Sequence, residues 1–359
     1  MRAKVYTVTP CIWQSYGSIL QAMSLQRKLC SMGYDSSIIK CEPYPTDMLK
    51  KMPIEFKSFK RLISSIYKRC IFQALNRRYQ STNNFLSKYV DITYFDTYEQ
   101  LVQKPPKADA FIAGSDQIWN PDNMCPLFYL DFVKNQCKRI SYAASMGVTN
   151  IPAYKATQMS EYLKNFQAIS VRESDNVPVL RQYTQKKISV NIDPVFLQKA
   201  EQWRKFETEY PMENHPYILV YAIYWEKSLN AQLKELHKKT GMKIVTISSG
   251  LQCVYATRRI FDADPGQFLW LLDHAAAVVT SSFHGVAMSI LFQKPLAAVI
   301  NPNAPSRIAC LMDTLGIPVL SIPDLLENGK KIDYPRVNEQ IANEQTRSES
   351  YLKEALSEI

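Results

Sequence analysis

The chain has 359 residues, of which 46% are hydrophobic and 21% are charged, and it carries a net charge of +10. This composition excludes a disordered protein, and the length predicts two domains because it exceeds what one core usually supports. No apolar run reaches the ~20 residues that span a bilayer, and the first residues have a β pattern rather than that of a signal peptide, so a cytoplasmic protein is predicted. The cysteines show no C-x-x-C spacing, so no metal site is expected.

Strand-like runs alternate with helical patterns in the first half of the chain, which predicts a parallel sheet built from strand–helix–strand units. The first strand leads through Tyr16 and Gly17 into a helical pattern over residues 19–32. This loop has a single glycine, so it is neither a G-x-G-x-x-G fingerprint nor a Walker loop. We expect Tyr16 and Gly17 only to line the cleft. The expected strands are residues 4–9, 36–40, 91–95, 108–114, 139–144, 168–171 and 189–192.

A basic segment lies between the second and third expected strands. Residues 47–88 contain ten lysines and arginines against two acidic residues, a charge of +8. Apolar residues recur among them at helical spacing, which predicts a basic amphipathic helix suited to peripheral contact with an anionic membrane. A solvated helical insertion is the alternative. No nucleic-acid partner is predicted, because no recognised binding motif accompanies the charge.

Polar and aromatic residues follow the fourth expected strand, where the sequence Gly-Ser-Asp-Gln-Ile-Trp-Asn-Pro begins at Gly114. Parallel α/β sheets bind ligands at the carboxyl ends of their strands. We therefore expect Asp116 to provide a reactive carboxylate and Trp119 to form an apolar wall against a sugar, with Ser115 and Asn120 beside them. The alternative is that Ser115 and Asp116 only cap the turn.

Arg172 comes directly after the sixth expected strand. Its planar guanidinium can hold a carboxylate or a phosphate with two parallel charge-assisted bonds. The alternative is a surface ion pair with Glu173 or Asp175, which would stabilise little. Further along, residues 199–212 are charged and aromatic without strand periodicity, and we expect the junction between the domains there.

The alternation restarts at residue 217 and predicts a second α/β domain. The expected strands are residues 217–223, 243–248, 276–280, 296–300 and 318–321, and the expected helices are residues 228–240, 265–274, 285–292 and 306–315. We therefore expect an N-terminal domain over residues 1–200, a C-terminal domain over residues 213–335 and a docking helix within residues 338–359. The cleft would lie between the two domains.

The strand that ends at Thr280 is followed by Ser-Ser-Phe-His-Gly and then by a helical pattern. This order places the imidazole of His284 at a strand-to-helix turn, where the N–H groups that open the helix favour an anion. His284 is one of only four histidines and is the main candidate for chemistry; the alternative is a histidine that only caps the helix. After the next strand, Ser306 can cap a helix whose first turn contains Arg307, a cation that an anionic ligand would stabilise there.

Five segments, in this order along the chain, together resemble the polysaccharide pyruvyl transferase family. They are Tyr16-Gly17-Ser18-Ile19-Leu20-Gln21, Gly114-Ser115-Asp116-Gln117-Ile118-Trp119-Asn120-Pro121, Ser170-Val171-Arg172-Glu173, Asp193-Pro194-Val195-Phe196-Leu197 and Ser281-Ser282-Phe283-His284-Gly285. The resemblance implies a GT-B-like fold of two Rossmann-like domains, with the acceptor on the N-terminal side and the donor on the C-terminal side. The implied reaction transfers the pyruvyl group of phosphoenolpyruvate onto sugar hydroxyls of a polysaccharide or lipid-linked oligosaccharide and forms a pyruvate ketal.

The resemblance also implies roles for individual residues. The resemblance implies that Arg172, His284 and Arg307 bind the donor, and we expect Ser281, Ser282 and Gly285 beside them. From their positions in the sequence, we expect Tyr16, Gly17, Ser115, Trp119 and Asn120 to bind the acceptor. His284 would exchange protons, since an unperturbed imidazole has a pKa of ~6.5, and Asp116 would accept a proton from the acceptor hydroxyl. Many relatives carry arginine at the position of Ser282, and no cofactor is implied because phosphoenolpyruvate is a substrate.

Two other functions stay open from the sequence. A glycosyltransferase of similar fold would use a nucleotide sugar and would need an acidic residue for the ribose, for which Asp264 and Asp273 are candidates. A non-enzymatic assembly factor at the inner face of the cell membrane would depend on the basic segment alone. Release of phosphate from phosphoenolpyruvate in the presence of a sugar distinguishes the pyruvyl transferase from both.

Overall fold

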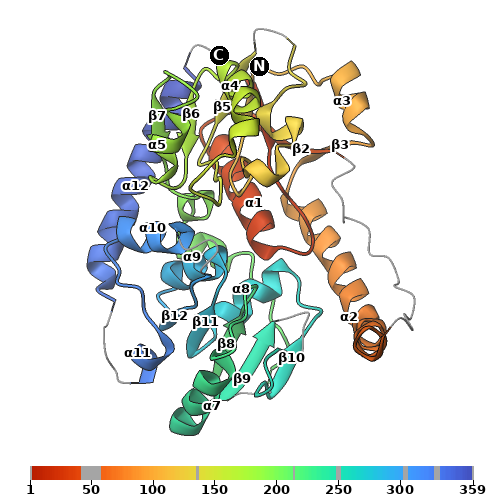
Figure 1. The fold of residues 1–359 in the computed structure, drawn as a ribbon, viewed down its shortest axis with the longest axis vertical. Helices are drawn as coiled ribbons and strands as arrows, with labels where there is room; N and C mark the ends of the chain where they lie inside the picture. The colour runs from red at the N-terminus through yellow and green to blue at the C-terminus, as the bar shows by residue number, and fades with distance from the viewer. Residues whose placement is uncertain are drawn as a thin grey trace.

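The computed structural model describes residues 2–41, 58–134, 137–212, 215–247, 252–301, 306–326 and 332–357. Two five-stranded parallel sheets form its centre, one in the upper half of the molecule in Figure 1 and one in the lower half. In each sheet the first strand in sequence lies in the middle. The next two strands are added on one side of it and the last two on the other side, which is the Rossmann order. The structure therefore confirms two Rossmann-like domains.

The N-terminal sheet has the order β3-β2-β1-β4-β5. Its strands are β1 (Lys4–Val8), β2 (Asp35–Cys41), β3 (Ile92–Phe95), β4 (Ala110–Ala113) and β5 (Lys138–Ser141). Strand β1 is central, since Val5 lies opposite both Ser36 and Ala110. A parallel pair, β6 (Ile169–Val171) and β7 (Ile188–Val190), continues the sheet through isolated bridges beside β5.

The C-terminal sheet has the order β10-β9-β8-β11-β12. Its strands are β8 (Tyr217–Tyr221), β9 (Lys243–Ile247), β10 (Arg258–Ile260), β11 (Ala277–Thr280) and β12 (Leu296–Ala298). The strand expected at residues 318–321 is wrong, because this stretch contributes only the Leu320 carbonyl to the N–H of Ala298, at 2.8 Å. Strand β10 was not expected, since its Arg-Arg-Ile sequence has no apolar pattern.

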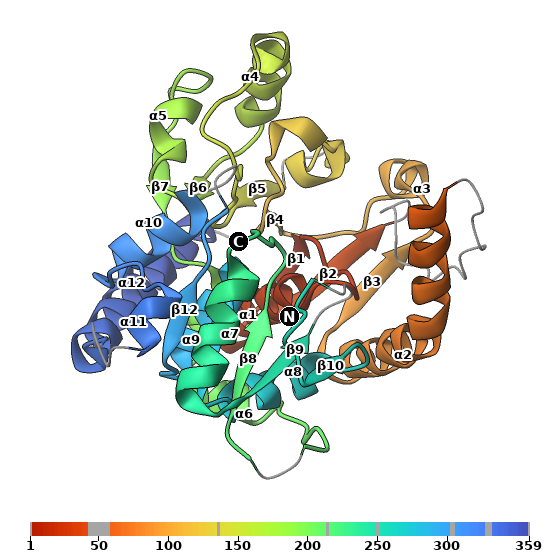
Figure 2. The same cartoon turned by 60° about the horizontal axis from the view of Figure 1, so that its bottom comes forward.

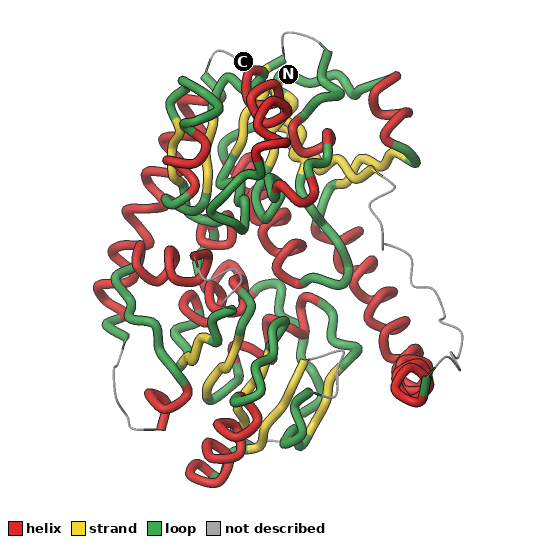
Figure 3. Tube along the Cα trace, in the orientation of Figure 1, coloured by secondary structure: helices red, strands yellow, loops and turns green. Residues whose placement is uncertain are grey.

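Helices flank both sheets, as Figures 2 and 3 show. The α-helices are α1 (Tyr16–Ser31), α2 (Phe59–Tyr89), α3 (Tyr98–Gln103), α4 (Ala156–Lys164), α5 (Asn176–Leu180), α6 (Ala200–Arg204), α7 (Leu229–Thr240), α8 (Pro265–Asp273), α9 (Phe283–Leu291), α10 (Ser306–Thr314), α11 (Ile322–Leu326) and α12 (Tyr334–Ala355). Short 3-10 turns are η1 (Pro121–Asn123), η2 (Pro126–Tyr129), η3 (Ala153–Lys155) and η4 (Pro194–Leu197). The helices expected in the C-terminal domain are all present.

Helix α2 forms the described part of the basic segment, and it confirms a helix there; residues 42–57 lie outside the described residues. Its later turns bury Ile71, Phe85 and Leu86, whereas Ile66 is 44% exposed and Arg69 is exposed. None of the described helices is long and apolar enough to cross a membrane.

Apolar side chains of the two domains pack against each other. This packing fixes the sheet edges that carry the candidate residues relative to each other. Tyr16 of α1 stacks on Phe268 of α8, with ring centroids 4.4 Å apart, and its hydroxyl donates to the Ala263 carbonyl at 2.8 Å. Helix α12 runs along both domains in Figure 1. Its last turns bury Tyr351 and Leu352 in a cluster of the N-terminal domain.

Candidate active site

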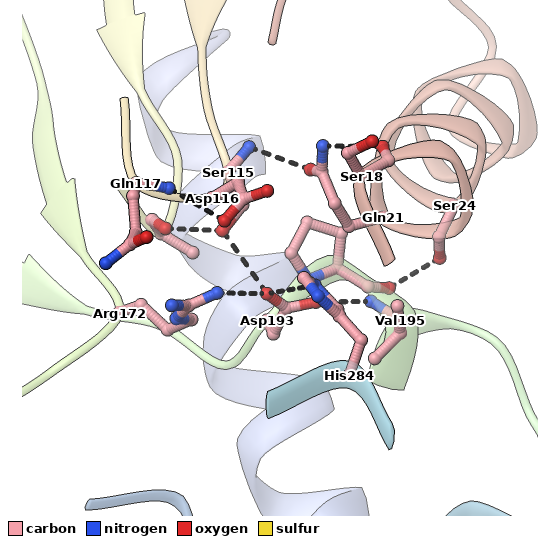
Figure 4. A network of polar contacts seen from close by, with 12 residues as sticks. Ser18, Gln21, Ser24, Ser115, Asp116, Gln117, Arg172, Asp193, Val195 and His284 are labelled. Atoms are coloured by element: carbon pink, nitrogen blue, oxygen red, sulfur yellow. Dashed lines mark hydrogen bonds and ion pairs between the residues drawn. The ribbon is translucent and has the colours of Figure 1, made fainter. Parts of the chain in front are cut away.

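A buried carboxylate, Asp193, connects side chains from both domains (Figure 4). It follows β7 and is 1% exposed. Its Oδ2 accepts a hydrogen bond from Arg172 Nη1 at 2.9 Å and lies 3.4 Å from both Ser115 Oγ and His284 Nε2. Its Oδ1 accepts the Val195 N–H at 3.1 Å. Arg172 and Ser115 come from the N-terminal domain and His284 from the C-terminal domain, so this carboxylate joins the two halves of the molecule.

The neighbouring side chains keep Asp193 ionised. Burial alone would raise the pKa of Asp193, but His284 and Arg172 outweigh burial and lower this pKa below its ordinary range. Burial would likewise lower the pKa of Arg172, yet the carboxylates of Glu173 and Asp193 raise it. Arg172 and Asp193 therefore form a charged pair in a dry environment.

Arg172 is held in place from three sides. Its Nε donates to Glu173 Oε1 at 2.8 Å, and its guanidinium lies over the Phe283 ring, 3.8 Å from the centroid. The expected alternative, an ion pair with Glu173, therefore forms, but it is buried rather than at the surface, since the Arg172 side chain is only 3% exposed. Among the described residues, nothing accepts a hydrogen bond from Arg172 Nη2, and nothing donates one to Glu173 Oε2. A buried N–H group without a partner is available to an anionic ligand.

His284 lies in the first turn of α9, as its sequence position predicts. Ser282 caps this helix and accepts the Gly285 N–H at 3.3 Å, so the helix does not need His284 as its cap. The imidazole packs against Gly17 of α1, where an added Cβ would be 2.1 Å from His284 Nδ1. Its other ring nitrogen, Nε2, faces Asp193 Oδ2 at 3.4 Å. The imidazole is thus held between Gly17 and Asp193, where the two domains meet.

Arg307 begins α10 and lies near the same group of charges. Burial and the nearby Arg172 lower the pKa of Arg307, while Asp116, Glu173 and Asp193 act in the opposite sense. Its Nε is buried and finds no hydrogen-bond partner in the described part of the structure. Arg172 and Arg307 line a cavity of about 20 Å³, which holds about one water molecule.

Asp116 belongs to the site, although one of its carboxylate oxygens also caps a turn. Its Oδ1 accepts the Gln117 N–H at 2.8 Å, and its carbonyl accepts the Ser145 N–H at 2.9 Å. Its side chain is partly exposed beside Ser115 in Figure 4. Its charge acts on both Arg172 and Arg307.

Several predicted acceptor residues have structural roles instead. Trp119 is completely buried, stacks with Tyr129 at a centroid distance of 5.8 Å and donates to the Phe128 carbonyl. It therefore lacks the exposed face that a sugar wall requires. Asn120 caps η1, and Tyr16 is 1% exposed with its hydroxyl bonded to Ala263. Of the predicted acceptor residues, Ser115 and Gly17 are the ones that lie against Asp193 and His284.

Three of the predicted donor-binding residues also have structural roles within the protein. Ser281 Oγ donates to the Tyr224 carbonyl at 3.0 Å and accepts the Tyr224 N–H at 2.8 Å, which anchors the loop after β8. Ser282 caps α9, as described above. Gly285 permits close packing, because an added Cβ would lie 2.3 Å from Thr280 Oγ1.

The two aspartates considered for binding a nucleotide ribose also have partners within the protein. Asp264 caps α8 by accepting the Gln267 N–H at 2.9 Å. Asp273 accepts from Arg204 Nε at 2.7 Å and from Arg204 Nη2 at 3.2 Å. In the described residues no group of three or more His, Cys, Asp and Glu side chains could hold a metal ion.

No local pattern in the sequence assigns a role in the site to Asp193 or Glu173. The available signal for Asp193 was its place directly after a strand, next to a proline that begins a turn. Glu173 was considered only as a surface partner of Arg172.

The fold and the site define a GT-B type of protein, in which two Rossmann-like domains face each other. Two solved structures share this fold over nearly their full length. The S. aureus MnaA–UDP co-structure has 12% identity, covers 99% of this chain and 98% of that chain, and has a TM-score of 0.54. A putative UDP-N-acetylglucosamine 2-epimerase from Listeria monocytogenes has 10% identity, covers 100% and 98%, and has a TM-score of 0.50. At these identities the likeness shows the fold alone.

The model of the family described as polysaccharide pyruvyl transferase matches residues 16–303, which is most of the chain. The chain belongs to this family, and it is a transferase that acts on a polysaccharide. No curated protein matches the chain.

Proposed function

We propose that this protein transfers the pyruvyl group of phosphoenolpyruvate onto two hydroxyls of a sugar and forms a cyclic ketal. The observation that carries the proposal is the contact of Arg172 and His284 with one buried carboxylate, Asp193, where the two domains meet. The family match and the unpartnered Arg172 Nη2 and Arg307 Nε support it, because phosphoenolpyruvate has a carboxylate and a phosphate that guanidinium groups bind well.

The reaction needs proton transfers that the site residues can perform. One sugar hydroxyl adds to C2 of the enol phosphate while a proton is added to the C3 methylene carbon. The second hydroxyl then displaces phosphate from C2, which leaves a methyl group and two C–O bonds. In the balance of the reaction, the loss of one hydroxyl proton is matched by the proton gained at the methyl carbon. The other hydroxyl proton leaves with the phosphate, so the atoms balance. His284 delivers the proton to C3, and Asp116 accepts one from the attacking hydroxyl.

Both domains supply donor contacts in this proposal. Arg172 comes from the N-terminal domain, and His284 and Arg307 come from the C-terminal domain. The cavity of about 20 Å³ between the two arginines is too small for phosphoenolpyruvate. Donor binding there therefore requires α10 or the loops after β6 and β7 to move.

A lipid-linked oligosaccharide is the acceptor that we propose, with peripheral contact at the inner face of the cell membrane. The support is the +8 charge of residues 47–88 and the exposure of Ile66 and Arg69 on α2. No resident cofactor or metal is needed by the proposed reaction.

The test is an assay of the purified protein with phosphoenolpyruvate and a panel of oligosaccharide acceptors. We expect phosphate release that depends on the acceptor, and an acceptor mass increase equal to a ketal-bound pyruvate. A parallel reaction with nucleotide sugars measures nucleotide release. Nucleotide release without phosphate release would reject pyruvyl transfer in favour of glycosyl transfer.

A further inference from the structure

The charges at the site do not yet balance a phosphoenolpyruvate donor. Arg172 and Arg307 are opposed by three carboxylates, those of Glu173, Asp193 and Asp116, whose charges act on one or both arginines. If His284 is left out of the count, the two arginines and the three carboxylates together carry one more negative charge than positive. An anion with both a carboxylate and a phosphate needs more positive charge nearby. This argument rests on the proposed function.

A third arginine, Arg78 of helix α2, lies against Tyr16, the residue before Gly17. Its guanidinium lies over the Tyr16 ring, 4.1 Å from the centroid, and its Nη2 donates to the Gln14 carbonyl at 2.9 Å. Its Nε is buried, and no described residue accepts a hydrogen bond from it. No carboxylate of the described residues forms an ion pair with Arg78 in this structure, so its charge is available to an anion.

Aromatic contacts connect Arg78 to the first turn of α9. The ring of Tyr16 is 5.8 Å from that of Tyr221, and Tyr221 packs so closely on Gly285 that an added Cβ would lie 3.1 Å from its ring. Tyr16 also precedes Gly17, which touches His284. Burial raises the pKa of Tyr16 and of Tyr221, and the charge of Arg78 acts against this rise at both hydroxyls. The positive charge therefore acts on groups in direct contact with the helix that carries His284.

The position of α2 is fixed by both domains. Tyr67 of α2 packs against Phe261 of the C-terminal domain, with ring centroids 6.3 Å apart. Trp13 of the N-terminal domain packs against Tyr79, with ring centroids 5.6 Å apart. Helix α2 therefore presents Arg78 at a defined place, although it belongs to the basic segment rather than to either sheet (Figure 1).

We propose that Arg78 is a further donor-binding residue and that its guanidinium holds an anionic group of the phosphorylated donor. The basic segment then has two separate parts. Its outer residues contribute positive charge at the surface, whereas Arg78 completes the charge of the site.

The test compares Arg78→Gln with Arg77→Gln, a matched variant one residue away on the same helix. Arg77 is exposed and pairs with Asp262, and such pairs contribute little to stability. Binding of phosphoenolpyruvate and of inorganic phosphate is measured by calorimetry, and steady-state rates give the KM of each substrate. We expect Arg78→Gln to weaken donor binding and to raise the donor KM by about 10- to 100-fold, the usual effect of losing a hydrogen bond to a charged group. Arg77→Gln should match the original protein.

Arg78→Lys separates binding from a purely structural role. It keeps the positive charge but loses the planar fork, so we expect donor binding between that of the original protein and Arg78→Gln. A lower melting temperature of Arg78→Gln with unchanged donor affinity would overturn the proposal. If the original protein releases no phosphate with any acceptor, the proposed reaction fails, and the calorimetry still decides whether Arg78 binds a phosphorylated anion. Absence of phosphoenolpyruvate and phosphate binding to the original protein would also reject Arg78 as a donor residue.

Discussion

Asp193 and His284 meet across the domain boundary. His284 Nε2 lies 3.4 Å from Asp193 Oδ2, and the same oxygen accepts a hydrogen bond from Arg172. In the proposed reaction His284 gives up its proton to the donor carbon. Asp193 therefore holds the proposed proton donor beside a proposed donor-binding arginine.

We expect His284→Ala to slow pyruvyl transfer by roughly 100- to 10,000-fold, the range typical of a lost proton-transfer residue. The fold should be retained, because His284 is in a helical first turn that Ser282 caps independently. Single-turnover phosphate release and circular dichroism of the same preparation check both parts. A folded variant that turns over at the original rate would remove His284 from the mechanism.

Asp193→Asn tests the carboxylate at nearly constant volume. It leaves Arg172 buried with one charged partner fewer, and breaking a buried pair costs about 3 kcal/mol or more. Since the folded-state pKa of Asp193 is lowered, its stabilisation is present above the unfolded-state pKa and is lost as the pH falls through the folded-state value. Urea unfolding at neutral pH should therefore separate the two proteins more than unfolding in acid. Asp175→Asn, which changes an exposed carboxylate, is the control, and an equal effect of both substitutions would contradict a special role for Asp193.

At the scale of single elements, the segment that follows α6 contains a partly buried acid with a shifted pKa. Burial, reinforced by the Asp273 carboxylate, raises the pKa of Glu207 from 4.5 to about 7, although His274 and Arg204 oppose the rise. Asp273 ends α8 and binds Arg204 at the end of α6. The packing of α6 on α8 is thus sensitive to pH.

Because its pKa is higher in the folded chain, Glu207 is protonated in the folded protein at pH values where it is already ionised in the unfolded chain. In that range Glu207 lowers the free energy of unfolding. Stability contributed by the protonated form is full below pH 4.5 and falls as the pH rises toward 7. We expect Glu207→Gln to melt at a higher temperature than the original protein at pH 8 and at nearly the same temperature at pH 4. Thermal unfolding across this range tests it, with the exposed Glu209→Gln as control. A constant difference at every pH would mean that ionisation of Glu207 is not responsible.

Elements with a clear apolar period were predictable, and those held by tertiary contacts were not. Every described strand except β10 lies within or beside an expected strand, and each of these except β3 contains at least one buried apolar residue. Strand β10 has two arginines in three residues and forms only because β9 provides a partner. The basic helix α2 was expected, but its contacts with Gln14 and Asp262 lie 64 and 185 residues away in sequence and leave no local signal.

The same distinction applies to the site. Arg172 and His284 stand at strand ends, where the fold places ligands, so their positions were predictable. Trp119 also follows a strand, but only the packing of Tyr129 and Phe166 decides that its ring faces the core. The pairing of Asp193 with a histidine 91 residues later depends on how the domains meet, which no local pattern encodes.

At the scale of the whole molecule, the basic segment and the cleft make separable contributions to the proposed reaction. We expect replacement of Lys57, Lys60, Arg61, Lys68 and Arg69 by glutamine to reduce sedimentation with anionic vesicles, since each basic residue near such a surface contributes about 1 kcal/mol. Transfer to a lipid-linked acceptor should slow, while transfer to a short soluble acceptor should be unchanged because Arg78 and the cleft are intact.

Replacing Lys234, Lys238 and Lys239 on α7 by glutamine controls for a general loss of positive charge, because these lysines are exposed on another helix. Vesicle binding should persist in that protein at moderate salt. Equal vesicle binding by the original protein and the five-residue variant would show that residues 47–88 are only a solvated insertion.

Helix α12 has a consequence for how the protein is made. Its residues Tyr351 and Leu352 fill the same cluster as Val5, Leu25 and Leu29, which are among the first parts of the chain to be synthesised. At the usual rate of translation, roughly 20 to 70 seconds separate the emergence of β1 from that of α12. During this interval the N-terminal sheet has an uncovered apolar layer, which chaperones on the ribosome can bind. The N-terminal domain is therefore completed only after the C-terminal domain has been synthesised.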